Sequence, residues 1–329
     1  MSIASLPRFK TLLLCGLLAA PLGPAQAAEE AGGPYRLVIG FPPGGALDGL
    51  ARALAEELRV SLNETVLVDN RPGASTRISI EYVKNARPDG RTLLLVGTPS
   101  LVLFPMTYAR LNYDAKKDFV PLAHLATVPN VVSTAPNAPY ASMAEYARWI
   151  KANPTANGVG MTNLGGVLHF SVLKMSQQLG VKLEPVTYKG GAPLATDIMG
   201  GHVPLGTDAL ASQLELHRGG KLRILGVGGT QRLPWLPDVP TVRESGIDGF
   251  DRAVAVYGAF APAGTPKEVI GRLEAAMTAA MKSRAVADRV ERLGMVPTGL
   301  PGATLAQSMD EDARYWAPVV KESGFKAAD

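Results

Sequence analysis

The chain has 329 residues, a formal net charge of +4, 47% hydrophobic residues and a single cysteine. The net charge is only weakly positive, so the composition does not indicate the basic surface that nucleic-acid binding requires. A single cysteine excludes a disulfide framework and thiolate metal sites. After removal of a leader, about 300 residues are long enough for two domains.

The first 27 residues are typical of a secretory signal. Arg8 and Lys10 precede an apolar stretch at residues 11–22, which is too short to span a bilayer comfortably. A small-x-small sequence ends at Ala27, so we expect cleavage there. An uncleaved anchor helix is the alternative. Cys15 lies inside the leader, so the exported chain would contain no thiol.

Strand and helix patterns alternate along the rest of the chain. We expect strands at residues 37–41, 66–69, 92–97, 130–134, 159–161, 183–188, 203–207 and 222–227. We expect helices at residues 46–62, 77–86, 142–151, 166–179, 193–199, 209–217, 266–293 with a break near Ser283, and 303–322. This alternation predicts an α/β fold whose sheets are largely parallel.

Three helix starts carry the capping-box pattern, in which a Ser or Thr is followed three residues later by Glu. They begin at Ser142, Thr241 and Thr265. Pro266 is expected at the first helical position of the third, and Gly294 is expected to end that helical region.

The turn at residues 41–48 joins the first expected strand to the first helix. Such a unit directs backbone N–H groups at one point, and the helix dipole adds partial positive charge there. Glycines in the turn allow a ligand to approach the backbone. The sequence therefore predicts an anion site formed by Phe41, Pro43, Gly44, Gly45, Ala46 and Asp48. An ordinary tight turn, with Asp48 as a favourable first-turn acid, is the alternative. The dinucleotide and P-loop spacings do not occur here.

A similar unit spans residues 160–169. Thr162 and Asn163 offer side-chain donors, while Gly165 and Gly166 again permit close approach. A helix entry capped by Thr162 or Asn163 is the alternative. Two such units together predict a two-sided clamp for a carboxylate.

Two further residues follow expected strands. Thr98 and Asp208 would face the same crevice, because ligands in parallel α/β sheets collect at the carboxyl ends of strands. Asp208 would accept a hydrogen bond from a ligand, or cap the next helix. Lys189 would attract an anion, or be an ordinary surface charge.

Catalytic signatures are missing from the sequence, which has no G-x-S-x-G elbow and no H-E-x-x-H motif. The four histidines show no metal-ligand spacing, and His169 is interpreted as a structural residue at a helix entry. We therefore expect no catalytic residue, no metal and no cofactor.

Seven short motifs, in their order along the chain, make the sequence resemble the Bug/TctC family, the periplasmic solute-binding receptors of tripartite tricarboxylate transporters. These motifs begin at Phe41, Asn70, Pro88, Tyr113, Tyr188, Leu236 and Ala261 and read FPPGGALD, NRPGA, PDG, YD with KDF, YKG, LPDVPT and APAGTP. They cover essentially the whole chain after the leader.

The resemblance implies a periplasmic-binding-protein fold of type II, with two α/β lobes, a ligand cleft and two crossings between lobes near residues 130 and 251. Lobe 1 would comprise residues 28–130 plus 252–329 and lobe 2 residues 131–251, after the signal peptide at residues 1–27. In such receptors the loops that correspond to residues 41–48 and 162–166 hold the ligand carboxylate, and Asp208 resembles the acidic residue near its distal end.

The implied function is capture of a small organic carboxylate (a di- or tricarboxylate, an amino acid or an aromatic acid) in the periplasm for a membrane transporter. The alternatives are a ligand sensor that docks on a sensor kinase and an exported enzyme. The expected partners are the ligand and either transporter subunits or a kinase, with no nucleic acid, and we expect a monomer.

Three departures from the family pattern bear on the ligand. Residues 75–77 read Ser-Thr-Arg where glycines are common, and Pro204 replaces a usual Asp. The second loop carries Leu164, Val167 and neighbouring apolar or small residues in place of polar ones. We therefore expect a ligand with an apolar or aromatic body rather than citrate.

Overall fold

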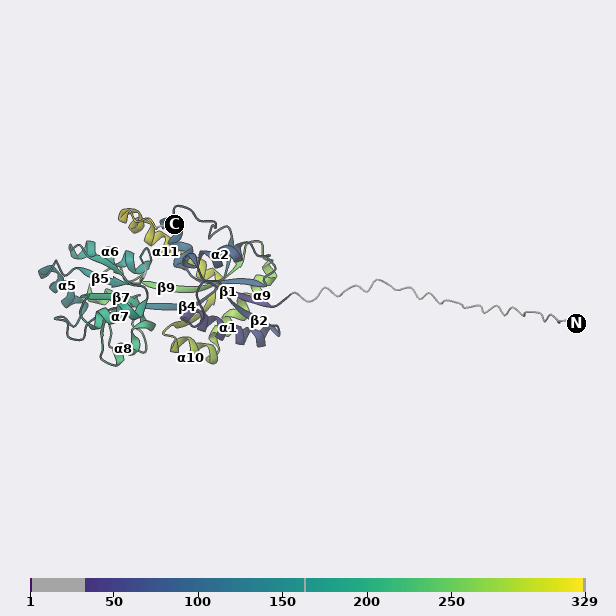
Figure 1. Ribbon diagram of the computed structural model, residues 1–329, viewed down its shortest axis with the longest axis horizontal. Helices are drawn as coiled ribbons and strands as arrows, with labels where there is room; N and C mark the ends of the chain where they lie inside the picture. The colour runs from purple at the N-terminus through teal and green to yellow at the C-terminus, as the bar shows by residue number, and fades with distance from the viewer. Residues whose placement is uncertain (2–32, 163, 328–329) are drawn as a thin grey trace. The chain divides into compact units, whose positions relative to one another are not determined.

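Two long strands, β4 (Phe119–Thr134) and β9 (Val254–Pro262), link two groups of strands into one curled sheet (Figure 1). The computed structural model describes Met1, residues 33–162 and residues 164–327. Both groups belong to the compact unit Pro34–Asp329.

The first group contains the parallel strands β2 (Val66–Asn70), β1 (Tyr35–Ile39) and β3 (Thr92–Gly97). Ile39 pairs with both Asn70 and Leu95, so the carboxyl ends of the three strands meet at one edge. Strand β9 runs antiparallel to β3, and β4 runs antiparallel to β9. Strand β10 (Val296–Pro301) also pairs with β4.

The second group contains the parallel strands β6 (Glu184–Thr187), β5 (Gly158–Met161) and β7 (Leu205–Ala209). Met161 pairs with both Thr187 and Thr207, so these carboxyl ends also share an edge. The second half of β4 runs antiparallel to β7 and to β8 (Arg223–Val227).

These strand directions turn the two edges toward each other. Strand β4 points from the first group into the second, parallel to β3 and antiparallel to β7. The carboxyl end of β3 touches β9 at Val256, which pairs with Thr127 of β4, whereas the carboxyl end of β7 pairs with Asn130. Three residues of strand span about 10 Å, so the loops that follow β3 and β7 start close together.

Helices cover the faces of both groups. Helix α1 (Ala46–Leu62) buries Leu47, Leu50, Leu54 and Leu58, and it packs with α9 (Lys267–Lys282) and α10 (Arg284–Arg292) in one apolar core. Each fully buried leucine of this stripe contributes roughly 1.5–3 kcal/mol. The other helices are α2 (Arg77–Lys84), α3 (Pro99–Val102), α4 (Phe104–Thr107), α5 (Met143–Ala152), α6 (Val167–Leu179), α7 (Gly191–Met199), α8 (Leu214–Arg218) and α11 (Gly302–Ser323), with short 3-10 turns at Ala74–Thr76, Leu210–Ser212 and Arg243–Ser245.

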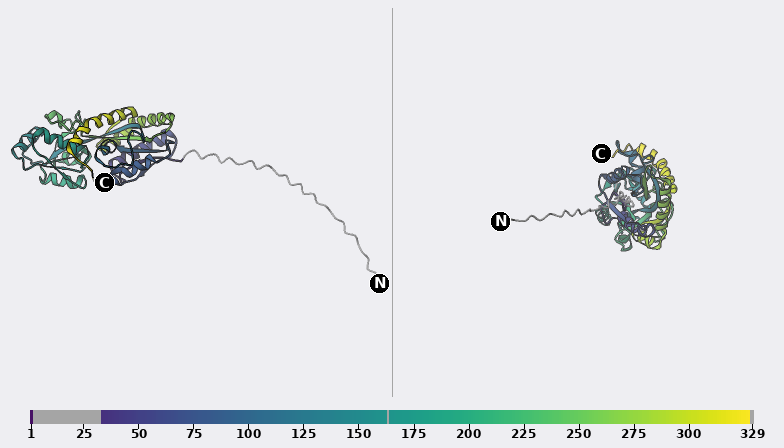
Figure 2. Two further views of the ribbon diagram at one scale, coloured as in Figure 1. Left: turned by 90° about the horizontal axis from the view of Figure 1, so that it is seen from above. Right: turned by 90° about the vertical axis from the view of Figure 1, so that its right-hand side faces the viewer.

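The C-terminal helix α11 links the two groups. It lies along the first group and packs against α6 of the second (Figures 1 and 2). Trp316 and Val320 of α11 and Phe170 of α6 belong to one buried apolar cluster. Arg252, where the chain returns to β9, pairs with Glu311 and Asp312 of α11 at 3.2 and 3.1 Å. The C-terminal segment thus braces a crossing between the two groups.

The α/β class is confirmed, with corrections to individual elements. The sequence predicts largely parallel sheets, but β9, β10 and the first half of β4 were not foreseen and form antiparallel pairs. Strand β7 ends at Ala209, so Asp208 lies inside this strand and does not follow it.

The helix starts were predicted with mixed success. Ser142 accepts a hydrogen bond from the Glu145 amide and caps α5, as predicted. Thr241 forms the reciprocal hydrogen bonds of the box with Glu244, but only the 3-10 turn Arg243–Ser245 follows it, so the helix start predicted there is wrong. The box at Thr265 is wrong: its hydroxyl bonds the Pro262 carbonyl, and Pro266 precedes the first helical residue. The break at Ser283 is confirmed, because its hydroxyl caps α10.

The leader lies outside the described residues, so the signal peptide, the cleavage site after Ala27 and the position of Cys15 stay predictions. Among the helices that the structure describes, none combines the length and apolarity needed to cross a membrane. The lobe boundaries also stay predictions.

Candidate functional site

The first loop is held in shape by the carboxylate of Asp48, which is almost fully buried. One carboxylate oxygen accepts from the Gly44 amide at 3.0 Å and from the Arg52 Nε at 2.8 Å. The other accepts from the Arg52 Nη2 and the Asn70 Nδ2, both at 3.0 Å. Asn70 also donates to the Phe41 carbonyl at 3.1 Å. Asp48 therefore ties the start of α1 to the end of β2.

The hydrogen bonds from Arg52, helped by those from Gly44 and Asn70, lower the pKa of Asp48 to about 2, against the opposing effect of burial. Relative to the ordinary value of 3.8, this corresponds to about 2 kcal/mol of stabilisation of the folded state. Because both carboxylate oxygens already accept hydrogen bonds from the protein, Asp48 stabilises the conformation of the loop. Its predicted contact with a ligand stays a prediction.

The N-terminus of α1, next to the hydrogen bonds of Asp48, is exposed. Gly44 has a φ of +92°, a conformation that favours glycine, and Gly45 precedes the helix without a side-chain cap. A Cβ at Gly44 would meet no atom within 4 Å, and one at Gly45 only the Pro42 carbonyl oxygen at 3.9 Å. Residues 41–45 are exposed. The first amides of α1 thus lie beside free space, as an anion site requires.

The second loop, between β5 and α6, is more enclosed. The Gly165 amide donates to the His169 Nδ1 at 3.2 Å, and Gly165 has a φ of +80°. A Cβ on Gly165 would come within 2.5 Å of the Phe325 ring, which also contacts the ring of His169. Burial lowers the pKa of His169, which favours the neutral imidazole that accepts this bond. The interpretation of His169 as a structural residue agrees with this geometry.

The predicted donors of the second loop have different surroundings. Thr162 donates to the Asp208 Oδ1 at 2.8 Å. Gly166 is buried, whereas Leu164 is 48% exposed. Asn163 lies outside the described residues. The structure thus joins Thr162 to Asp208, and the remaining predicted contacts to a ligand stay predictions.

Asp208 itself is buried, and each of its carboxylate oxygens accepts a hydrogen bond from a hydroxyl group of the protein. Its second carboxylate oxygen accepts from the Ser212 hydroxyl at 2.8 Å and would lie 2.8 Å from a Cβ at Gly191, the first residue of α7. A carboxylate beside a helix N-terminus is favourable. Thr98 is also buried, and its amide donates to the Val256 carbonyl at 2.8 Å.

The predicted residues therefore gather at two facing edges. Residues 41–48 and Thr98 lie at the carboxyl ends of β1 and β3, whereas Thr162 and Asp208 lie at those of β5 and β7. The two edges approach each other along β4 and β9.

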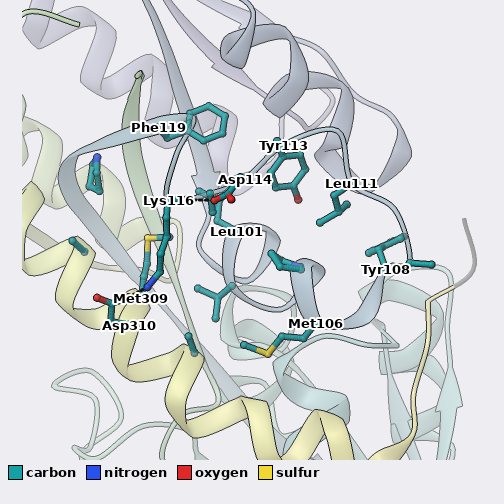
Figure 3. Close-up of a pocket in the computed structure, with 17 residues that line it drawn as sticks. Leu101, Met106, Tyr108, Leu111, Tyr113, Asp114, Lys116, Phe119, Met309 and Asp310 are labelled. Carbon is teal, nitrogen blue, oxygen red and sulfur yellow. Dashed lines mark hydrogen bonds and ion pairs between the residues drawn. The ribbon is translucent and has the colours of Figure 1, made fainter. Parts of the chain in front are cut away.

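A separate cavity of about 610 Å³ lies within the first group, between the α3–α4 segment, residues 108–119 and α11 (Figure 3). Its wall is mainly apolar, with Leu101, Met106, Phe119 and Met309 around it, and Lys116 pairs with Asp310 at 2.7 Å. Its lining includes none of the predicted site residues.

Sequence reasoning missed the residues that support the loops. The spacing of Asp48 and Arg52, four apart on a helix, is a signal that could have indicated their ion pair. Asn70 and Phe325 reach their loops from distant parts of the chain, and local sequence carries no signal for such contacts. In the part of the chain that the structure describes, no group of three or more potential metal ligands occurs.

Comparison with known proteins assigns the family. Residues 50–325 match the model of the tripartite tricarboxylate transporter family receptor, TctC. The chain is 30% identical to the protein BugT of Bordetella pertussis over 322 residues, which cover 96% of this chain and 98% of that protein.

Two solved structures from Rhodopseudomonas palustris have the same fold. MatC, with bound malate, has a TM-score of 0.72 and 29% identity, over 87% of this chain and 98% of that one. Rpa4515, with adipate, has a TM-score of 0.78 and 28% identity, over 91% and 99%. The predicted two-lobed solute-binding fold is thereby confirmed, and the chain belongs to the TctC family of tripartite tricarboxylate transporter receptors.

Proposed function

We propose that this protein is a periplasmic receptor that captures a small organic carboxylate between the loops at residues 41–48 and 162–166. The observation that carries the proposal is the open N-terminus of α1, where the Cβ positions of Gly44 and Gly45 face open space and Gly45 provides no side-chain cap. The buried Asp48 network pre-organises that loop, which reduces the entropy lost on binding.

The family and its relatives support this ligand class. MatC and Rpa4515 were solved with malate and adipate, both carboxylates. We assign lobe 1 to residues 28–130 plus 252–329 and lobe 2 to residues 131–251. Closure of the two lobes would bury the anion and create a new surface for transporter subunits. The secretory signal expected at residues 1–27 supports the periplasmic location.

The two loops differ in polarity, and this difference suggests how the ligand is oriented. The carboxylate would bind at the open α1 terminus, and an apolar or aromatic body would lie toward Leu164 and Val167. Leu164 is 48% exposed, so its side chain is accessible to a ligand. Tighter binding of citrate than of adipate or benzoate would contradict this orientation.

Isothermal titration calorimetry with malate, adipate and benzoate tests the receptor function. The wild type should bind at least one of them. Gly45→Asp places a carboxylate in the cradle, and two charges about 4 Å apart near a protein surface repel by about 4 kcal/mol, so affinity should fall at least about a hundredfold.

Gly45→Ala is the matched control. Its methyl group enters open space, 3.9 Å from the Pro42 carbonyl oxygen, so it should keep the fold and most of the affinity. Absence of binding to all three acids, or equal affinity of Gly45→Asp and the wild type, would refute the proposal.

A ligand sensor that docks on a sensor kinase would use the same closure. Deletion of the gene separates the two functions: loss of carboxylate uptake indicates transport, and loss of a transcriptional response with normal uptake indicates sensing.

A further inference from the structure

Three consecutive non-glycine residues, Ala74, Ser75 and Thr76, adopt left-handed backbone conformations, with φ values of 45°, 53° and 75°. They follow Gly73, whose φ is also positive. L-residues adopt this region at a cost, and for a β-branched residue such as Thr76 it is a genuine outlier. Strain of this kind persists only where the surrounding structure imposes it, and it concentrates at functional sites.

N-capping of helix α2 does not explain the strain. Thr76 occupies the N-cap position but makes no side-chain capping bond. Side chains that follow residues 74–76 hold this segment instead. Arg77 Nε donates to the Ala74 carbonyl at 3.0 Å, and the Ser79 hydroxyl donates to the Thr76 carbonyl at 2.7 Å. The neighbouring side chains thus hold a conformation that the backbone alone would avoid.

The strained run lies against the first loop of the proposed site. The Arg71 amide donates to the Ile39 carbonyl at 2.8 Å, so the segment after β2 continues alongside the segment after β1. Gly40 packs so tightly on Thr76 that a Cβ at Gly40 would lie 2.6 Å from the Thr76 Cβ. The run is therefore a neighbour of the turn that begins at Phe41.

The two hydroxyls of the run have different surroundings. Thr76 is buried, and its hydroxyl donates to Ser100 at 3.1 Å, so it serves the packing behind the loop. Ser75 is exposed, and its hydroxyl has no hydrogen-bond partner among residues 33–162 and 164–327. The strained run thus presents one exposed hydroxyl, on the residue next to Thr76, which packs on Gly40 before the first loop.

We propose that Ser75 is a further ligand-binding residue of the carboxylate site. Its hydroxyl bonds a polar oxygen of the ligand, and the strained run is the support that holds it there. This inference rests on the proposed receptor function and adds a second contact point beside the α1 terminus.

Two substitutions of Ser75 separate its hydroxyl from its backbone. Ser75→Ala removes the hydroxyl and keeps the strain, so affinity for the tightest-binding acid among malate, adipate and benzoate should fall about fivefold, as expected for one hydrogen bond. Ser75→Gly removes both the hydroxyl and the backbone strain. Affinity should therefore fall by the same factor as in Ser75→Ala, while the melting temperature rises by about 2 °C.

Asn63→Gly is the matched control. Asn63 also has a positive φ, of 50°, but it caps the far end of α1, about 25 Å from the helix start. This variant should bind like the wild type. Unchanged affinity of both Ser75 variants, with the wild type binding, would overturn this inference and leave the receptor function intact. Failure of the wild type to bind any of the three acids would overturn both.

Discussion

Asp48→Asn tests whether the buried carboxylate organises the first loop. All four groups around Asp48 are donors: the Gly44 amide, two nitrogens of Arg52 and the amide of Asn70. An asparagine there loses the charge and turns one acceptor into an NH₂ group that faces donors. The free energy of unfolding at pH 7 should therefore fall by at least about 2 kcal/mol, the value that corresponds to a pKa of about 2 in the folded state.

The contribution of Asp48 to the free energy of unfolding should depend on pH. The pKa of Asp48 is lower in the folded than in the unfolded chain, so its stabilisation is present above about pH 4 and is lost as the pH falls through about 2. Urea unfolding at pH 7 and pH 3 should show the difference between wild type and Asp48→Asn shrinking by about half at pH 3.

Glu56→Gln is the control on the same helix. Glu56 is 71% exposed and pairs with Arg289 at 3.3 Å, so its loss should change stability by less than about 0.5 kcal/mol. A destabilisation by Asp48→Asn that is equal at pH 7 and pH 3 would refute the electrostatic explanation.

Two predictions concern the second loop. Gly165→Ala should destabilise the fold by more than Gly180→Ala, because both sites have positive φ values but only the methyl group at Gly165 would collide with Phe325; equal midpoints of urea unfolding would argue against this contact. Burial lowers the pKa of His169, so the unfolded chain takes up its proton first and stability falls as the pH drops below about 6.5. His169→Gln, whose amide oxygen can still accept from Gly165, should weaken that pH dependence in thermal melts between pH 5 and pH 8.

Most of the fold could be predicted from local sequence, because apolar periodicity and glycine or proline turns act over a few residues. Helix α1, the break at Ser283 and the cap at Ser142 follow from such signals. The antiparallel strands β9 and β10 escaped prediction, since their pairing with β4 depends on contacts between residues more than 100 positions apart.

By itself, the sequence determined the turn that opens α1, its glycines and the family to which the motifs belong, because these depend on residue types at short spacing. Only the tertiary structure decided that both carboxylate oxygens of Asp48 are used by Arg52, Gly44 and Asn70. It alone also placed Phe325 against Gly165 and Thr76, next to the strained Ser75, against Gly40 and Ser100, because these contacts join segments that are far apart in the sequence.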